Sequence, residues 1–175
     1  THRLTVIDEV TFPADAPAEF LLHGSLRVVA SEPAVSEVPL GETEKFFGIN
    51  AGEAGSGRLK LKRYRAAGSP SSVKLSYEGV FDFGLGDQKE EYTRGFRETS
   101  GLLNDQGVYL AGSGFWYPYV SRELIEFKME IVQPEGWHVI SQGNGTSRDA
   151  LGKARWESHG PMDEIYLVGG PLRVY

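Results

Sequence analysis

The segment Leu124-Ile125-Glu126-Phe127-Lys128-Met129-Glu130-Ile131-Val132 carries the clearest structural signal in this chain, because apolar and charged residues alternate along it. The apolar residues of one face would be Ile125, Phe127, Met129 and Ile131, and the charged residues of the other would be Glu126, Lys128 and Glu130. A period of two residues is typical of a strand with one buried face. A helix would place Phe127 and Ile131 on different flanks, and Pro134 follows closely. The segment therefore predicts a half-buried β-strand.

Other segments alternate in the same way or are short runs rich in strand-forming residues. These predicted strands are Arg58–Tyr64, Val73–Glu78, Leu4–Phe12, Phe20–Val29, Trp137–Ser141, Ala154–Glu157 and Ile165–Val168. Turn-forming residues separate them, for example Gly24-Ser25, Gly68-Ser69-Pro70, Pro134-Glu135-Gly136, Gly143-Asn144-Gly145 and Gly160-Pro161. Many short strands at this spacing are typical of antiparallel all-β proteins. We therefore expect an all-β fold. Its sheets would enclose the core as a twisted antiparallel β-sandwich, a barrel or a saddle-like system of sheets.

The composition agrees with many strands and turns. The chain of 175 residues contains 22 Gly and 9 Pro, which resist the interior of a helix, and the Gly share is well above the usual value of about 7%. Hydrophobic residues make up 40% of the chain, so a core can form without disulfide bonds. We expect a single domain over residues 1–175. The absence of Cys excludes Cys nucleophiles, Cys zinc sites and thiol redox chemistry, but it does not fix a compartment.

The charge and hydropathy of the chain limit the kinds of partner that we expect it to bind. The formal net charge of −6 disfavours nucleic-acid binding, because the phosphate field would repel the chain. A basic run could form a local positive strip, but charged residues on a strand also protect an exposed sheet edge. The run contains Arg58, Lys60, Lys62, Arg63 and Arg65. No apolar run approaches the roughly 20 residues that a membrane helix requires. We therefore expect neither a nucleic-acid partner nor a membrane span.

The patterns of the common catalytic sites are absent from the sequence. The 4 His residues are His2, His23, His138 and His159, and none begins an H-E-x-x-H zinc motif. Ala111-Gly112-Ser113-Gly114 falls short of the G-x-S-x-G nucleophile motif, and nothing in the sequence ties His138 or His159 to Ser113 or Ser56. Gly52–Leu59 is a near miss of a phosphate-binding loop. We therefore expect no catalytic residue, no metal ligand and no cofactor in this chain.

The aromatic cluster Phe115-Trp116-Tyr117-Pro118-Tyr119 is the most conspicuous local feature. If it is exposed, it could stack on a sugar or form one wall of a ligand cleft. If it is buried, it would close one end of the core, and burial is the favoured reading for Trp116. One or two of the Tyr hydroxyls would still reach solvent.

From Gly107 to Tyr175 the sequence resembles a known family. The blocks that carry the resemblance are G-V-Y-L (Gly107–Leu110), F-W-Y-P (Phe115–Pro118), F-K-M-E-I (Phe127–Ile131), P-E-G-W-H-V-I-S-Q-G (Pro134–Gly143) and P-M-D-E-I-Y-L-V-G-G-P (Pro161–Pro171). In this order they are similar to the N-terminal domain of the membrane alanyl aminopeptidase family of gluzincin zinc peptidases, in particular its bacterial members. Ser72–Val80 also fits a strand of that domain, and Pro134–Gly143 is the most specific block.

The resemblance implies a twisted, saddle-like β domain that packs against a thermolysin-like catalytic domain. In the family, the H-E-x-x-H zinc motif, the third Glu ligand, the transition-state Tyr and the G-x-M-E-N loop all lie downstream of the N-terminal domain. Zinc is therefore expected only in a catalytic domain that this sequence does not include. Gly160–Glu164 imitates G-x-M-E-N, but Asp163 and Glu164 stand where that loop has Glu and Asn. Its position matches a strand of the N-terminal domain instead.

The ends of the sequence, Thr1-His2-Arg3 and the apolar run Leu172–Tyr175, fit a piece of a longer protein. We expect a fragment that hydrolyses nothing by itself and caps the cleft of a parent zinc metallo-aminopeptidase, whose catalytic domain would be its partner and whose substrates would be peptides. An exposed apolar patch would then mark the missing contact. The alternative is a free-standing β-sandwich module that binds carbohydrate or peptide through Phe115–Tyr119.

The resemblance also indicates candidate site residues. Family members usually contribute one Gln or Glu to the site for the peptide's amino terminus, from the segment that leads into the aromatic cluster. Here that segment is Ala111–Gly114, which has neither an acid nor an amide. If it lines the substrate cleft, Ser113, Trp116 and Tyr117 are the candidate residues.

Overall fold

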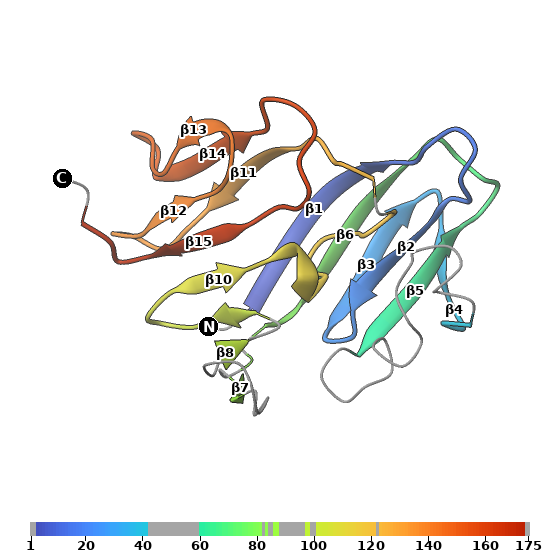
Figure 1. Ribbon diagram of the computed structural model, residues 1–175, viewed down its shortest axis with the longest axis horizontal. Coiled ribbons are helices and arrows are strands. Elements are labelled where there is room, and N and C mark those ends of the chain that lie inside the picture. Colours follow the sequence, from blue (N-terminus) through green and yellow to red (C-terminus); the bar gives the residue numbers. More distant parts are fainter. Residues whose placement is uncertain are drawn as a thin grey trace, which may run out of the picture. The chain divides into compact units, whose positions relative to one another are not determined.

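The fold is built from antiparallel β-strands (Figure 1). The structure, a computed structural model, describes residues 3–41, 60–81, 83, 86–87, 97–98, 101–121 and 123–173. All strand pairings among these residues are antiparallel, and their helical content is a single 3-10 turn, η1 (Gly112–Gly114). The expected all-β fold is thus confirmed.

The chain divides into two compact units. The N-terminal unit consists of Arg3–Phe81 and Phe115–Arg122, and the C-terminal unit is built mainly from Asp82–Gly114 and Glu123–Tyr175. The chain therefore leaves the N-terminal unit once, returns to it for the aromatic cluster, and leaves it again. The single domain that we expect over residues 1–175 remains a prediction.

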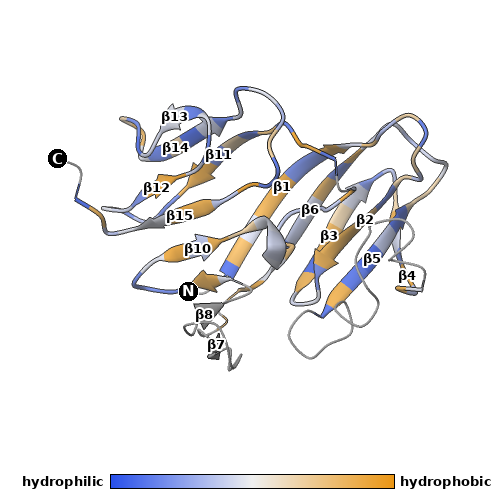
Figure 2. Cartoon of the chain, viewed as in Figure 1, coloured by the Kyte–Doolittle hydropathy of each residue, from blue (hydrophilic) through white to orange (hydrophobic). Residues whose placement is uncertain are grey.

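The first sheet of the N-terminal unit has the strand order β1-β6-β3, with β1 at Arg3–Thr11, β6 at Ser72–Val80 and β3 at Leu26–Glu32. Polar and apolar residues alternate along its strands (Figure 2), and the buried residues of β6 are Val73, Leu75 and Tyr77. On the opposite face of β6, Glu78 accepts hydrogen bonds from Arg3 of β1 and Arg27 of β3. The central strand therefore contributes to the core with one face and to ion pairs with the other.

The second sheet of this unit has the order β2-β5-β4, with β2 at Glu19–His23, β5 at Leu61–Ala66 and β4 at Val35–Val38. Strand β2 is buried along its whole length. The N–H of Leu21 donates to the carbonyl of Tyr119 (2.9 Å), and the N–H of Tyr119 donates to the carbonyl of Leu21 (3.0 Å). The N–H of His23 donates to the carbonyl of Phe115 (2.9 Å). The returning aromatic segment thus supplies the backbone partners that β5 does not supply.

The two sheets of the N-terminal unit share one core. Lys62 of β5 donates to the carbonyl of Leu26 in β3 (3.2 Å), and the Tyr64 hydroxyl hydrogen-bonds with the backbone of Val28. The ring of Phe20 stacks on that of Tyr64, with centroids 5.4 Å apart. The largest fully buried side chains of this unit are Tyr77, Phe20, Phe81, Leu21, Leu22, Leu26 and Val73. Each such side chain stabilises the fold by about 1.5–3 kcal/mol when it leaves water.

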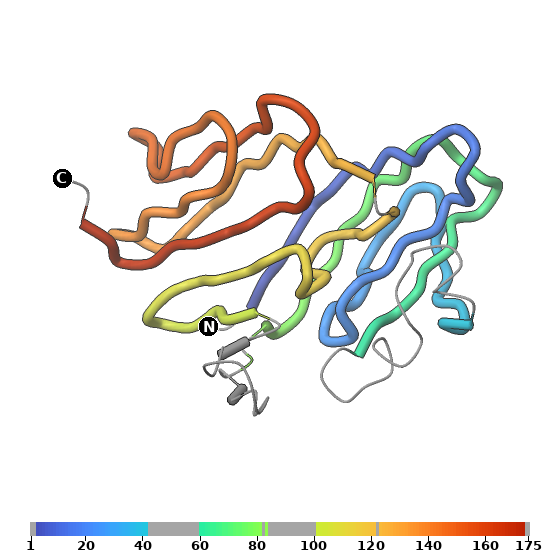
Figure 3. The backbone as a smooth tube through the Cα atoms, in the orientation of Figure 1, coloured from blue at the N-terminus to red at the C-terminus, as the bar shows by residue number. Residues whose placement is uncertain are grey.

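Most predicted strands of this unit are confirmed with shifted ends. The segment Phe20–Val29, drawn in blue in Figure 3, contains β2 and β3, which a turn at Gly24-Ser25 connects and which belong to different sheets. A Cβ on Gly24 would lie 2.6 Å from the carbonyl oxygen of Lys60, so the close approach of β5 requires glycine here. The predicted strand Arg58–Tyr64 begins at Leu61 and continues to Ala66. Strand β4 was not predicted, because Val35–Val38 is too short to show a period.

The C-terminal unit contains a four-stranded sheet with the order β12-β15-β10-β9. These strands are β12 (His138–Ile140), β15 (Leu167–Gly170), β10 (Val108–Leu110) and β9 (Leu102–Leu103). A three-stranded sheet has the order β11-β14-β13, with β11 at Lys128–Val132, β14 at Lys153–Glu157 and β13 at Asn144–Thr146; β7 (Gly86–Asp87) pairs with β8 (Arg97–Glu98). The indole N–H of Trp156 in β14 donates to the carbonyl of Val139 in β12 (3.0 Å) and so connects the two larger sheets.

The predicted strand Leu124–Val132 is confirmed only from Lys128 onward. Met129 and Ile131 are half-buried and alternate with exposed charged residues, as predicted. Ile125 instead forms an isolated bridge with Met162, through two backbone hydrogen bonds of 2.8 Å. The predicted turn Gly143-Asn144-Gly145 is wrong for its last two residues, which belong to β13. Only Gly143 turns, with a φ of 87°.

Candidate functional site

Ser113 lies in the middle of η1 and is exposed, whereas Gly112 and Gly114 on either side of it are buried. Its backbone N–H donates to Oε2 of Glu164 (3.3 Å). The other oxygen of this carboxylate, Oε1, accepts a hydrogen bond from the Tyr166 hydroxyl. The fold of the C-terminal unit therefore brings an acid to the segment Ala111–Gly114, which has none of its own.

The Ser-Gln-Gly part of the most specific sequence block holds Glu164 in place. The Gln142 amide donates to the carbonyl of Glu164 (3.0 Å), and its oxygen accepts from the N–H of Tyr166 (2.8 Å). The Ser141 hydroxyl donates to the carbonyl of Tyr166 (2.6 Å). Backbone groups that leave a sheet need other partners. Because β12 ends at Ile140 and β15 begins at Leu167, these side chains supply the missing partners.

The Pro-Glu-Gly-Trp part of the same block is a turn held from both sides. The Gln133 amide donates to the carbonyls of Trp137 (3.0 Å) and Ser147 (2.8 Å). Arg148 donates to the carbonyls of Pro134 (3.1 Å) and Trp137 (3.1 Å). Gly136 has a φ of 76°, a backbone conformation that favours glycine. The polar residues around this block therefore position backbone within the C-terminal unit.

Trp116 and Tyr117, the other two candidate residues, belong to the N-terminal unit, whereas Ser113 belongs to the C-terminal unit. Trp116 is only 4% exposed, as favoured from the sequence, and Tyr117 is half-buried. Their rings meet edge to face with centroids 5.2 Å apart. Phe115 has a φ of 54°, which is unusual for a residue with a side chain, and its ring is buried against Leu21 and Leu61.

Three residues of the basic run, Lys62, Arg63 and Arg65, form hydrogen bonds inside the N-terminal unit. Arg63 and Arg65 both donate through Nε to Glu19, at 2.6 and 2.5 Å, and Glu19 and Arg63 are buried. The interpretation of β5 as an exposed sheet edge is wrong, because β5 is the central strand of its sheet. The sequence pattern shows alternating charge but not the carboxylate that meets it from another strand. Arg58 and the whole of Gly52–Leu59 lie outside the described residues.

Two Ser–His pairs occur among the described residues, and neither is a pair considered from the sequence. His138 Nδ1 lies 3.2 Å from the Ser147 hydroxyl, and His23 Nδ1 lies 2.8 Å from the Ser25 hydroxyl. Burial lowers the pKa of His23 to about 4. A base with such a pKa accepts a proton from serine poorly near neutral pH. His23 Nδ1 also accepts the N–H of Ser25 (3.1 Å), so this pair shapes the turn between β2 and β3.

The described residues contain no group of three or more His, Asp or Glu side chains that could hold a metal ion. Within the same part of the chain, no helix has the length and apolar character needed to cross a membrane. Among the three candidate residues, Ser113 contacts a carboxylate, that of Glu164. The sequence patterns did not identify Glu164 as a candidate site residue. Its spacing of two residues from Tyr166 is the signal that could have placed both side chains on one face.

An exposed row of apolar side chains crosses the four-stranded sheet of the C-terminal unit. Strand register places Ile140 opposite Val168, Val168 opposite Tyr109, and Tyr109 opposite Leu102. Ile140, Val168 and Tyr109 are 46%, 40% and 41% exposed, and Leu102 is half-buried. Figure 2 draws parts of the strands β10, β12 and β15 in orange, the colour of hydrophobic residues. We call Ile140, Val168, Tyr109 and Leu102 the apolar row.

Comparisons with protein-family models, curated proteins and solved structures give no match for this chain.

Proposed function

We propose that this chain is the non-catalytic N-terminal β domain of a zinc aminopeptidase-like protein. In the parent it would cap the active-site cleft and help to position the amino termini of peptides. Zinc and the hydrolytic groups would belong to a catalytic domain elsewhere in the same polypeptide. The observation that carries this proposal is the apolar row, of which Ile140, Val168 and Tyr109 lie within the blocks that resemble the aminopeptidase family.

The apolar row has the properties of a surface that another domain covers. Single exposed apolar side chains are normal on a soluble protein, but a contiguous set on one sheet face is less common. Side chains directly opposite each other on paired strands lie about 5 Å apart, so Ile140, Val168 and Tyr109 form one surface. Covering it would remove apolar area from water at roughly 25 cal/mol per Å².

The hydrogen bonds of the most specific block also support a non-catalytic role. The side chains of Gln142 and Ser141 form hydrogen bonds with the backbone of Glu164 and Tyr166. The block would therefore be typical of the family because it builds the domain. The Glu164 carboxylate would supply the acid that Ala111–Gly114 lacks, and each of its oxygens keeps a second lone pair for a cationic amine.

The alternative, a free-standing module that binds carbohydrate or peptide through Phe115–Tyr119, has less support. Trp116 and Phe115 are buried, which leaves few ring faces for stacking on a sugar. A titration of the purified chain with oligosaccharides, followed by tryptophan fluorescence, would favour this alternative if it saturated.

The test of the aminopeptidase proposal uses the complete natural protein. Its reading frame should encode H-E-x-x-H downstream of Tyr175, and the purified protein should retain zinc and release amino-terminal residues from peptides. Val168→Lys in the apolar row should lower this activity, whereas Leu151→Lys is the matched control, because Leu151 is 79% exposed and lies outside the row. Glu164→Gln should raise KM for peptides more than it lowers kcat. A complete reading frame without H-E-x-x-H would overturn the proposal.

A further inference from the structure

Asn144 and Gly145 form the only Asn-Gly pair in the sequence, and both residues are exposed. They begin β13, which has three residues and lies at the edge of the sheet β11-β14-β13. An Asn followed by Gly is the most reactive arrangement for loss of the side-chain amide, because glycine has no Cβ to hinder attack by its own nitrogen. The exposed edge position makes this pair accessible to water.

The surroundings of this pair add two features. The amide nitrogen Nδ2 of Asn144 lies 3.2 Å from Nδ1 of His159, which is also exposed. A Cβ on Gly145 would lie 2.6 Å from the indole of Trp156 and would also meet the carbonyl oxygen of Arg155. The packing of Trp156 therefore requires glycine at position 145. A less reactive residue cannot replace Gly145 without displacing the indole that connects the two sheets.

We propose that Asn144 is a site of spontaneous deamidation, assisted by His159. The backbone nitrogen of Gly145 loses its proton to solvent base and attacks Cγ of Asn144, which forms a five-membered succinimide. The bond from Cγ to Nδ2 breaks, and this nitrogen takes a proton from water and leaves as ammonia, while the hydrogen bond that it donates to Nδ1 of His159 holds the side chain in place before the attack. Water then opens the ring at either of its two carbonyl groups. The products are aspartate and isoaspartate at position 144.

Attack by the Gly145 nitrogen requires β13 to leave its ladder for a short time. Short edge strands open locally at low cost, because few contacts hold them. Gly143, with a φ of 87°, precedes the pair in a turn conformation that glycine adopts without strain. The fold therefore slows the reaction without preventing it, and the unfolded chain should react faster than the folded one.

The products would weaken the same sheet. Asn144 is directly opposite Glu157 in β14, so a new carboxylate would face an existing one. Isoaspartate would also add one atom to the backbone of β13. Gly145 and Thr146 would then lose their register with Trp156 and Arg155. Deamidation would thus accumulate in the C-terminal unit over time. It would weaken the pairing of β13, the strand on which Trp156 packs.

The test is an incubation of the purified chain at neutral and slightly alkaline pH, followed by peptide mass spectrometry. Asn104 is an internal control, because its side-chain oxygen accepts the N–H groups of Gln106 (2.9 Å) and Gly107 (3.2 Å) and Asp105 follows it. We expect the acid form to accumulate at position 144 at least several-fold faster than at position 104. Part of it should be isoaspartate, and the rate should rise with pH.

Two variants complete the test, and neither alters a buried side chain. Asn144→Gln should abolish the modification at this position, because a six-membered ring forms much more slowly. His159→Gln should slow it several-fold while circular dichroism shows an unchanged fold. Equal rates at positions 144 and 104 would overturn the proposed site. A rate unchanged by His159→Gln would overturn the role of His159.

Discussion

The N-terminal unit buries the ion pair between Glu19 and Arg63, whereas the ion pairs of Glu130 in the C-terminal unit stay in water. In the N-terminal unit, Glu19 is 3% exposed and receives hydrogen bonds from Arg63 and Arg65. In the C-terminal unit, Glu130 pairs with Lys153 (2.6 Å) and Arg155 (3.0 Å). All three of these side chains are between 34% and 49% exposed.

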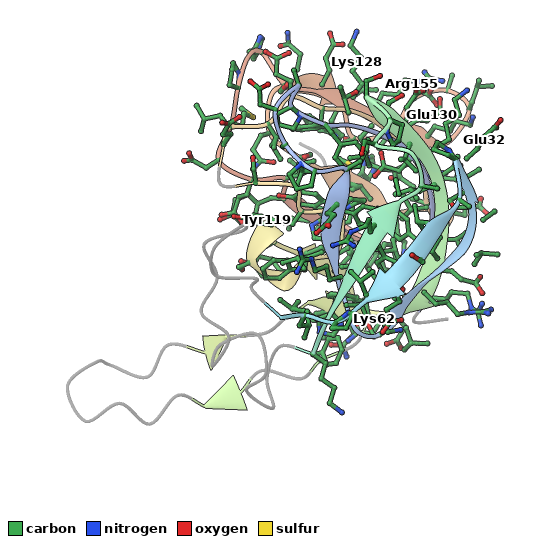
Figure 4. All side chains as sticks on the ribbon, turned by 90° about the vertical axis from the view of Figure 1, so that its right-hand side faces the viewer. Glu32, Lys62, Tyr119, Lys128, Glu130 and Arg155 are labelled. Atoms are coloured by element: carbon green, nitrogen blue, oxygen red, sulfur yellow. The ribbon has the colours of Figure 1, made fainter. Side chains whose placement is uncertain are left out.

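This difference shows that an ion pair affects stability differently when it is buried and when it is exposed to water. Charges that leave water lose hydration energy, so a buried carboxylate depends on its partners. Exposed charges keep much of their hydration and are screened by salt, so their pairing contributes little. Figure 4 labels Glu130 and Arg155 of this exposed cluster. Stability should therefore depend on Glu19 far more than on Glu130.

The largest effect should come from Glu19→Gln. This change keeps the size of the side chain but removes the carboxylate that pairs with the buried guanidinium of Arg63. Breaking a buried ion pair by removing one partner costs about 3–5 kcal/mol. Urea unfolding followed by tryptophan fluorescence would measure the loss. A cost close to that of Glu130→Gln, the matched exposed variant, would break the comparison between the two units.

The next effect should come from pH, through His23. Burial lowers the pKa of His23 to about 4 in the folded chain, below the unfolded value of 6.5. The unfolded chain therefore binds this proton more readily, so stability is complete above about pH 6.5 and falls as the pH approaches 4, by up to about 3 kcal/mol. Burial also raises the pKa of Asp8, which contributes a slope of the opposite sign.

The variant His23→Asn isolates the contribution of His23, because asparagine offers an acceptor near the position of Nδ1 but does not titrate. Unfolding free energies at several pH values should show a smaller acid-side loss in this variant than in the original chain. His159→Asn is the matched control, because His159 is exposed. An equal slope in all three proteins would show that His23 is not the source.

Substitutions on the two faces of the four-stranded sheet should differ moderately in their effect on the free energy of unfolding. Val139 is 2% exposed and lies next to Ile140 of the apolar row. Val139→Ala removes buried methyl groups and should cost about 2 kcal/mol. Val168→Lys changes the exposed face and should alter the free energy of unfolding by no more than about 0.5 kcal/mol. A large loss from Val168→Lys would mean that this face is already covered within the chain.

The smallest effect should come from Glu130→Gln. Hydrogen bonds from Lys153 and then Arg155 hold the pKa of Glu130 below its usual value, but the carboxylate is exposed. We expect a small shift of the urea midpoint at low salt that disappears at high salt, because salt screens exposed charges. A salt-independent loss would indicate that the C-terminal unit depends on this pair more than its exposure suggests.

The sequence by itself determined the fold class and the position of most strands. Alternation in segments such as Val73–Glu78 and Lys128–Val132 is a local property, because successive side chains of a strand face opposite ways. The Gly and Pro content likewise excluded a helical bundle. The lack of an H-E-x-x-H motif and of Cys was also readable without any structure.

Only the tertiary structure decided which residues meet. Glu19 and Arg63 come from separate strands, and β5 is central because β4, which was not predicted, covers its second edge. Glu164 reaches Ser113, and Ile140, Val168 and Tyr109 align, only through the register of strands far apart in the chain. Periodicity gives the face of each strand, but pairing depends on which strands close the sheet, and that is a property of the whole fold.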